Sequence, residues 1–116
     1  MHELSITQEV VRTVEDARRG AGLGLRVTAV RIKIGRLTAV VPDCLKFYYE
    51  ILTKDTPLEG ALVDIEIVPM KARCSACGAE FSLDEPVFLC PECGSGDTEI
   101  LSGRELVVES IEVDEM

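Results

Sequence analysis

The sequence predicts an α+β fold in which a small domain has two helices and a three-stranded sheet, with a four-cysteine module inserted before the last strand. Three observations support this. Apolar residues recur at helical spacing in two segments and alternate with polar residues in three others. Four cysteines form two close pairs between the second and third alternating segments. We expect the domain to comprise residues 1–69 and 104–116. Residues 70–103 form the insert, which is too short to fold without a bound metal or another cross-link.

The first helix is expected to begin at a cap. Residues 5–8, Ser-Ile-Thr-Gln, match a capping box in which the serine satisfies a free backbone N–H. Val10 and Val14 follow at helical spacing, and Gly20 marks the end of the helix. On this interpretation residues 1–4 precede the helix and form a free chain end.

The second helix is expected to begin at Pro42, because proline is favoured at the first helical position. Leu45, Tyr48 and Leu52 then recur along one side. Cys44 lies among these apolar residues, so we expect it to behave as a small buried hydrophobic residue. The alternatives for Cys44 are a thiol that contacts a bound metal or one that forms an intermolecular disulfide.

Three segments alternate in the manner of half-buried strands. They cover residues 26–34, the stretch that ends before Pro69, and residues 106–113. The residues expected to face inward are Thr28, Val30, Ile32 and Ile34, then Val63, Ile65 and Ile67, and finally Val107, Ile111 and Val113. The outward side chains of the first segment are basic and those of the second are acidic, so their faces would be complementary if the strands are neighbours.

Composition limits the function. The chain has 116 residues, is 47% hydrophobic and carries a formal net charge of −9. A nucleic-acid partner is not expected, because binding to phosphates depends on basic side chains. No apolar run approaches the ~20 residues that span a bilayer, and no signal-peptide pattern opens the chain, so we expect a cytoplasmic protein without a membrane partner. No catalytic constellation is present, so an enzyme is not expected.

The two cysteine pairs predict a metal site. Each pair is a Cys-x-x-Cys-Gly knuckle, and 12 residues separate them. Two such knuckles can complete a tetrahedral shell of four thiolates, which suits Zn²⁺ in a structural, zinc-ribbon-like module and leaves no open position for chemistry. The predicted zinc ligands are Cys74, Cys77, Cys90 and Cys93. Two alternatives remain open: a rubredoxin-like Fe(Cys)₄ electron carrier, and a zinc-ribbon interaction module that binds protein or nucleic acid.

His2 is the only histidine in the chain. A histidine at a chain end is usually a solvated side chain. The alternative is that the α-amine of Met1, the backbone nitrogen of His2 and its imidazole Nδ1 chelate one ion in a plane, which suits Ni²⁺ or Cu²⁺. A fourth donor is then needed. The candidates are the backbone nitrogen or carboxylate of Glu3, solvent, or a group from a partner.

Several segments resemble the HypA/HybF family of hydrogenase nickel-incorporation proteins over essentially the whole chain and in the same order. These segments are Met1-His2-Glu3-Leu4-Ser5, Ile34-Gly35-Arg36-Leu37, Thr56-Pro57-Leu58-Glu59-Gly60-Ala61, the two cysteine knuckles, and Ser102-Gly103-Arg104-Glu105-Leu106.

The resemblance implies a nickel metallochaperone for [NiFe] hydrogenase maturation, with a transient Ni(II) cargo and a structural Zn(II). It carries nickel binding over to His2, with Glu3 as an accessory ligand, and zinc binding to the four paired cysteines. It further implies a HypB-type GTPase and the hydrogenase large subunit as partners, with urease as a client of some members. A weak homodimer is kept open as the oligomeric state. Certain relatives use a further histidine from the zinc domain, and this chain has none there.

Overall fold

The computed structural model describes residues 3–116, which form two compact units. Among the described residues, the first unit contains 3–33, 40–66 and 107–116, and the second contains 34–39 and 67–106. The second unit therefore includes the expected insert and, in addition, a short segment that precedes the second helix. The assignment of nickel and zinc to the two parts of the chain stays a prediction.

Helix α1, Glu3–Ala21, begins earlier than expected. The predicted capping box at residues 5–8 is wrong, because Ser5 is already inside the helix. Glu3 places its negative charge in the first turn, where the helix dipole favours it. The hydroxyl of Thr7 donates to the backbone carbonyl of Glu3. Met1 and His2 lie outside the described residues.

Helix α2, Pro42–Thr53, begins at the predicted proline. Its buried side chains are Leu45, Tyr49 and Thr53, so Tyr49 takes the place that the sequence predicted for Tyr48. The Tyr49 hydroxyl donates to the carbonyl of Leu58 at 3.0 Å, which lets this large polar side chain be buried. Cys44 is exposed, so its predicted burial is wrong: the buried face of the helix is turned away from it.

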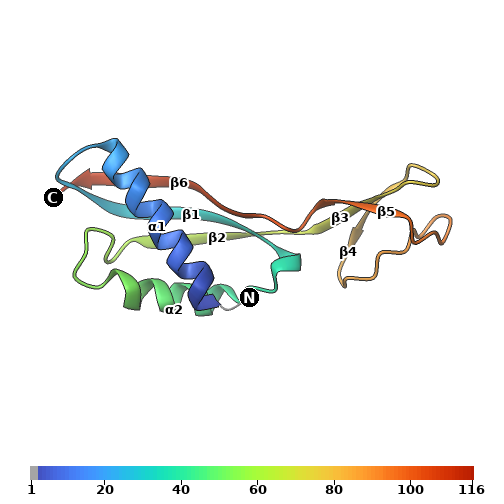
Figure 1. Ribbon diagram of the computed structural model, residues 1–116, viewed down its shortest axis with the longest axis horizontal. Helices are drawn as coiled ribbons and strands as arrows, with labels where there is room; N and C mark the ends of the chain where they lie inside the picture. Colours follow the sequence, from blue (N-terminus) through green and yellow to red (C-terminus); the bar gives the residue numbers. More distant parts are fainter. Residues whose placement is uncertain (1–2) are drawn as a thin grey trace. The chain divides into compact units, whose positions relative to one another are not determined.

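The first sheet has the strand order β2-β1-β6, with β1 in the centre. Its strands are β1, Leu25–Gly35, β2, Leu62–Val68, and β6, Leu106–Glu115. Figure 1 shows α1 lying across this sheet, with α2 beside α1. The helices and strands bury one apolar core in the first unit, which comprises Ile6, Val10, Val14, Val27, Val30, Ile32, Leu45, Tyr49, Leu58 and Val63. The predicted two-helix, three-stranded arrangement is confirmed.

Opposite charges face one another across the first sheet. Arg31 in β1 pairs with Asp64 in β2 at 3.4 Å, and Lys33 pairs with Glu109 in β6 at 3.8 Å. The first of these is the complementarity that the sequence predicted between a basic and an acidic strand face. All four side chains are well exposed, so each pair adds little to stability and serves mainly to favour the correct strand neighbours.

Some of the predicted inward positions are wrong. Val27, not Thr28, is buried, and the Thr28 hydroxyl donates to the carbonyl of Glu112. Ile67 and Val107 are 41% and 50% exposed. In β1 and β6 the burial pattern changes phase partway along the strand, so a strict alternation assigns some residues to the wrong face.

The second unit contains a sheet of strand order β4-β3-β5. Its strands are β3, Met70–Cys74, β4, Glu80–Leu83, and β5, Thr98–Ser102, and both pairings are antiparallel. A 3₁₀ helix, η1, covers Arg36–Thr38. Only a few side chains of this unit are buried, namely Ile34, Met70, Ala72, Cys74 and Cys90. Within residues 3–116, no helix has the length and apolar character needed to cross a membrane.

Candidate metal centre

The first cysteine pair lies at the end of strand β3, where the chain turns. Cys74 is the last residue of β3. The N–H of Gly78 donates to the carbonyl of Cys74 at 2.8 Å and closes the turn. Gly78 has a φ of +77°, a conformation that side chains rarely adopt, so the turn requires the glycine that follows Cys77.

The second pair repeats the same turn in a loop. The N–H of Gly94 donates to the carbonyl of Cys90 at 2.8 Å, and Gly94 has a φ of +75°. In both turns the first cysteine also donates its own N–H to a residue just beyond the glycine: Cys74 to Ala79 at 2.8 Å, and Cys90 to Ser95 at 2.9 Å. Two separate segments thus present their thiols from nearly identical backbone.

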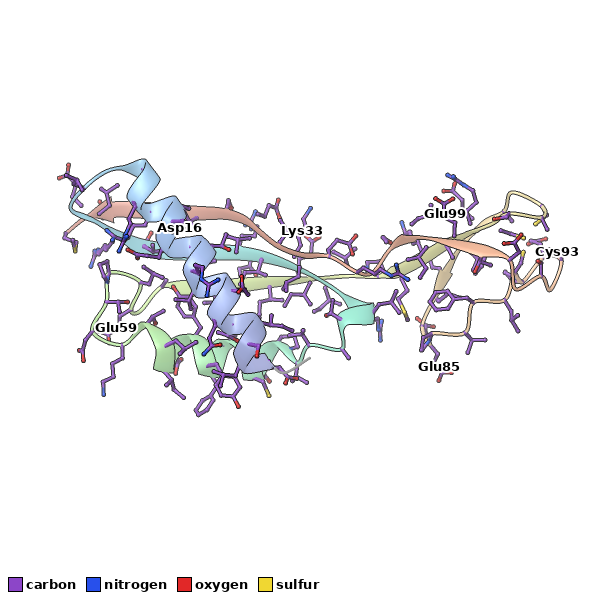
Figure 2. All side chains as sticks on the ribbon, in the orientation of Figure 1. Asp16, Lys33, Glu59, Glu85, Cys93 and Glu99 are labelled. Carbon is purple, nitrogen blue, oxygen red and sulfur yellow. The ribbon has the colours of Figure 1, made fainter. Side chains whose placement is uncertain are left out.

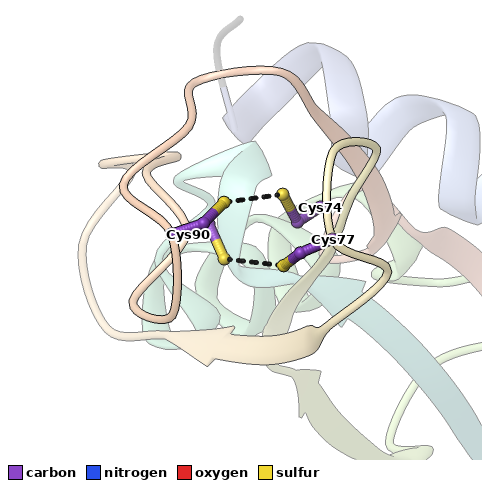
Figure 3. Close-up of side chains that lie close together, drawn as sticks. Cys74, Cys77 and Cys90 are labelled. Atoms are coloured by element: carbon purple, nitrogen blue, oxygen red, sulfur yellow. Dashed lines mark hydrogen bonds between the residues drawn. The ribbon is translucent and has the colours of Figure 1, made fainter.

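All four sulfur atoms gather at one point (Figure 3). They lie within 4.8 Å of one another, with 3.5 Å between the sulfurs of Cys74 and Cys93 and 3.6 Å between those of Cys77 and Cys90. A tetrahedron with metal–sulfur bonds of about 2.3 Å has sulfur–sulfur edges of about 3.8 Å. The donor set and its spacing therefore fit one tetrahedral Zn²⁺, and the structure brings together all four residues that the sequence predicted as ligands.

The protonation of the cluster explains why it suits a cation. The N–H of Cys77 stabilises the thiolate of Cys74 and lowers its pKa to about 7. The N–H of Ala79 likewise favours the thiolate of Cys77, but the neighbouring sulfurs of Cys90 and Cys74 outweigh it and raise the pKa of Cys77 to about 12. The pKa of Cys93 is also raised, because its neighbouring thiols outweigh a backbone N–H. Crowded thiolates repel one another, and a divalent cation removes that repulsion.

Within each knuckle the two cysteines are buried unequally. Cys74 and Cys90 are buried, whereas Cys77 and Cys93 are exposed. One thiol of each pair therefore anchors its knuckle in the unit and the other closes the shell from outside. The sequence did not reveal this division. It also did not reveal the backbone N–H donors of Ala79 and Ser95, because every residue other than proline has a backbone N–H and the sequence does not show which of them point at a sulfur.

The unit that holds the cluster also carries acidic side chains. Figure 2 labels Glu85 and Glu99 in the same unit as Cys93. Arg73 is paired with Glu80 at 3.3 Å and with Glu99 at 4.0 Å. The charge of Arg73 is therefore balanced within the unit.

Of the predicted nickel ligands, only Glu3 is among the described residues. It is half-buried and is the first residue of α1. Backbone N–H groups in the first turn of a helix have no acceptor within the helix, so the backbone nitrogen of Glu3 is not committed to a helical hydrogen bond. Within residues 3–116, the four cysteines are the one group of at least three His, Cys, Asp or Glu side chains that could hold a metal.

Known proteins are similar to this chain over nearly its whole length. The family described as "HypA: Hydrogenase/urease nickel incorporation, metallochaperone, hypA" matches residues 1–113. A "Hydrogenase maturation factor HypA" from Geotalea uraniireducens (strain Rf4) is 48% identical over 114 residues, which cover 98% of this chain and 100% of that protein. One from Desulfatibacillum aliphaticivorans is 43% identical over 113 residues, covering 97% and 87%.

A solved structure shares the fold. The "Solution structure of the Ni metallochaperone HypA from Helicobacter pylori" superposes with a TM-score of 0.69 over 97% of both chains, at 21% sequence identity. At that sequence identity the structural similarity supports a shared fold and nothing more. It agrees with the predicted α+β class.

Proposed function

The chain belongs to the HypA family of hydrogenase and urease nickel-incorporation proteins, and we propose on this premise that it is a nickel metallochaperone. It binds Ni²⁺ at its N-terminus and delivers the ion for insertion into the large subunit of a [NiFe] hydrogenase. The observation that carries the proposal is the family match from residue 1 to residue 113, which includes the Met-His-Glu start. The protein is a carrier, not an enzyme.

The proposed nickel port is the first three residues. The amine of Met1 and the backbone and imidazole nitrogens of His2 supply three donors in one plane, the geometry that Ni²⁺ prefers. The fourth donor comes from Glu3, solvent or a partner. The start of α1 at Glu3 supports a role for the backbone nitrogen of this residue, because no helical bond occupies it. Such an exposed site releases its ion readily, as delivery requires.

The proposed role of Zn²⁺ is structural. Cys74, Cys77, Cys90 and Cys93 hold it, and four thiolates leave no position for a substrate. When bound, the ion neutralises the thiolates and ties the two knuckles together. The binding free energy, on the order of 10 kcal/mol in small zinc modules, stabilises a unit whose apolar core is small.

The proposed partners follow from family membership. They are a HypB-type GTPase and the hydrogenase large subunit, in the cytoplasm, and urease is a second client to be tested. A weak homodimer is the proposed oligomeric state. Neither nucleic acid nor a membrane is a proposed partner, since the chain carries 21 acidic residues against 12 basic ones.

Titration with Ni²⁺ tests the port. Zinc-loaded wild-type protein should bind one Ni²⁺ more tightly than His2→Ala does, and affinity should fall as pH drops because the nitrogen donors must lose protons. Gln8→Ala, on an exposed position of α1, is the matched control and should bind as wild type does. Equal nickel binding by wild type and His2→Ala would exclude the port.

Metal analysis separates this proposal from its main rival. Purified protein should be colourless and contain one zinc before nickel is added. A coloured, reversibly reducible sample that contains iron would instead support the Fe(Cys)₄ electron carrier.

A further inference from the structure

Two glycine–arginine pairs that lie far apart in the sequence meet in the second unit: Gly35-Arg36 and Gly103-Arg104. The N–H of Gly35 donates to the carbonyl of Glu105 at 2.6 Å, and the N–H of Leu37 donates to the carbonyl of Gly103 at 2.7 Å. The donors flank Arg36 and the acceptors flank Arg104. The backbones of the two arginines therefore lie directly opposite each other, as in an antiparallel pair.

The residues around the arginines have a structural role. A Cβ added at Gly35 would overlap the backbone carbonyl of Gly103, so only glycine allows the two segments to approach this closely. Gly103 has a φ of +116°, which a side chain would strain. We call the place where the segments 35–37 and 103–105 lie against each other the crossing. The carboxylate of Glu105 accepts a hydrogen bond from the N–H of Gly103 at 2.7 Å, so it is already used within the crossing.

The two arginines have no such role. Both are exposed. Of the eight arginines in the chain, Arg12, Arg18, Arg19, Arg26, Arg31 and Arg73 pair with carboxylates. Arg36 and Arg104 pair with none among residues 3–116, although the chain carries 21 acidic residues.

The two arginines add positive charge that no carboxylate among residues 3–116 balances by an ion pair. Like charges placed opposite each other on paired backbone segments repel. The planar guanidinium groups offer several donors each, in a geometry that matches carboxylates. Arginine is also enriched at protein interfaces, where it supplies much of the binding energy. Two exposed arginines without an ion-pair partner among residues 3–116, on backbone segments that lie opposite each other, are thus available to bind an anion from outside the chain.

We propose that Arg36 and Arg104 form a docking site for an acidic segment of a partner protein, which they bind through its aspartate or glutamate side chains. The surrounding chain favours a short segment over an extended polyanion, because a net charge of −9 repels nucleic acid while two local cations can still hold two carboxylates. Neither arginine is among the proposed nickel or zinc ligands. The docking proposal can therefore be tested independently of the proposals on metal binding.

A short acidic peptide is the probe. Zinc-loaded full-length protein, labelled with ¹⁵N, is titrated with acetylated tetraglutamate, and the Nε–H signals of the arginines are followed by NMR. Saturable shifts are expected at Arg36 and Arg104, and they should weaken as salt is raised. Arg36→Gln and Arg104→Gln should each lower the affinity about threefold, and the double variant about tenfold.

Controls keep the result interpretable. The double variant Arg12→Gln/Arg19→Gln removes two exposed arginines of α1 that already have partners, and it should bind the peptide as wild type does. Lysine in place of Arg36 or Arg104 keeps the positive charge but loses the planar guanidinium that can bind a carboxylate through two N–H groups. It should therefore weaken binding less than glutamine does. Zinc content and nickel binding should be the same in all variants.

Two outcomes would overturn the proposal. One is equal affinity for tetraglutamate in wild type and in the Arg36→Gln/Arg104→Gln variant. The other is tighter binding of inorganic phosphate than of tetraglutamate, which would assign the two arginines to a phosphate ligand instead.

Discussion

At the scale of single residues, the structure shows that several positions are determined by one contact each. Gly35 is required by the carbonyl that lies against it, and Tyr49 is buried because its hydroxyl has an acceptor. Cys44, in contrast, has no contact that would bury it and is exposed. The sequence predicted the helix on which Cys44 and Tyr49 lie, but not which of its residues face the core.

Gly35→Ala tests the crossing of the two segments. The new methyl group would overlap the backbone of Gly103, and we expect a loss of about 1–3 kcal/mol in the free energy of unfolding. Gly20→Ala is the control, since a Cβ there meets nothing within 4 Å and alanine is the better helix former. Urea unfolding of the zinc-loaded proteins measures both. Equal stability of Gly35→Ala and wild type would contradict the close approach.

Tyr49→Phe tests a buried hydroxyl. Burial raises the pKa of Tyr49 from 10.0 to about 12, so the folded protein keeps this proton where the unfolded chain loses it. The stability that Tyr49 contributes is complete below pH 10 and is lost as the pH rises towards 12. Tyr49→Phe should remove this part of the alkaline loss, and at pH 8 should cost about 1–2 kcal/mol because the Leu58 carbonyl loses its donor.

The measurement is urea unfolding at pH 8 and at several values between pH 10 and 11.5. Tyr48→Phe, on a half-buried side chain of the same helix, is the control and should follow wild type. Identical pH dependence in wild type and Tyr49→Phe would show that the phenol does not titrate differently on folding.

At the scale of elements, local pattern predicted where most helices and strands lie, and erred where a second interaction competed. α1 already includes Glu3, whose negative charge in the first turn the helix dipole favours, a term that the capping-box pattern at residues 5–8 ignores. The cysteine knuckles were predicted well, because a two-residue spacing and a trailing glycine define the turn without help from the rest of the chain.

Cys74→Ser tests the knuckles as a metal-holding element. It replaces a buried thiol, the one whose pKa is lowered to about 7, and should weaken zinc binding at least about 100-fold in competition with a chromogenic chelator. Cys44→Ser, a thiol outside the cluster, should bind zinc as wild type does. Unchanged zinc affinity in Cys74→Ser would exclude this residue as a ligand.

At the scale of the whole molecule, the two units differ in what stabilises them. The first has a core drawn from both helices and from strands β1 and β2, whereas the second has short strands, long loops and few buried apolar side chains. A unit of this kind depends on its metal more than on its core.

Removing zinc should therefore act unevenly. With zinc chelated, amide hydrogen exchange should become fast in β3, β4 and β5 while α1 and α2 keep most of their protection. Mass spectrometry of peptides after timed exchange, with and without a chelator, measures the difference. Equal loss of protection in both units would show that the metal stabilises the chain as one body, and unchanged protection would show that the second unit folds without it.

The sequence by itself predicted the two helices, the three strands of the first sheet and the four cysteines that the structure gathers, because helical spacing, alternation and cysteine spacing are local properties of the chain. It also carried the family resemblance that the comparisons confirm. Only the tertiary structure decided which face of α2 is buried, and that the segments around Gly35 and Gly103 lie against each other with Arg36 opposite Arg104. These depend on contacts between residues that are distant in the sequence, and no local pattern records which distant segments will become neighbours.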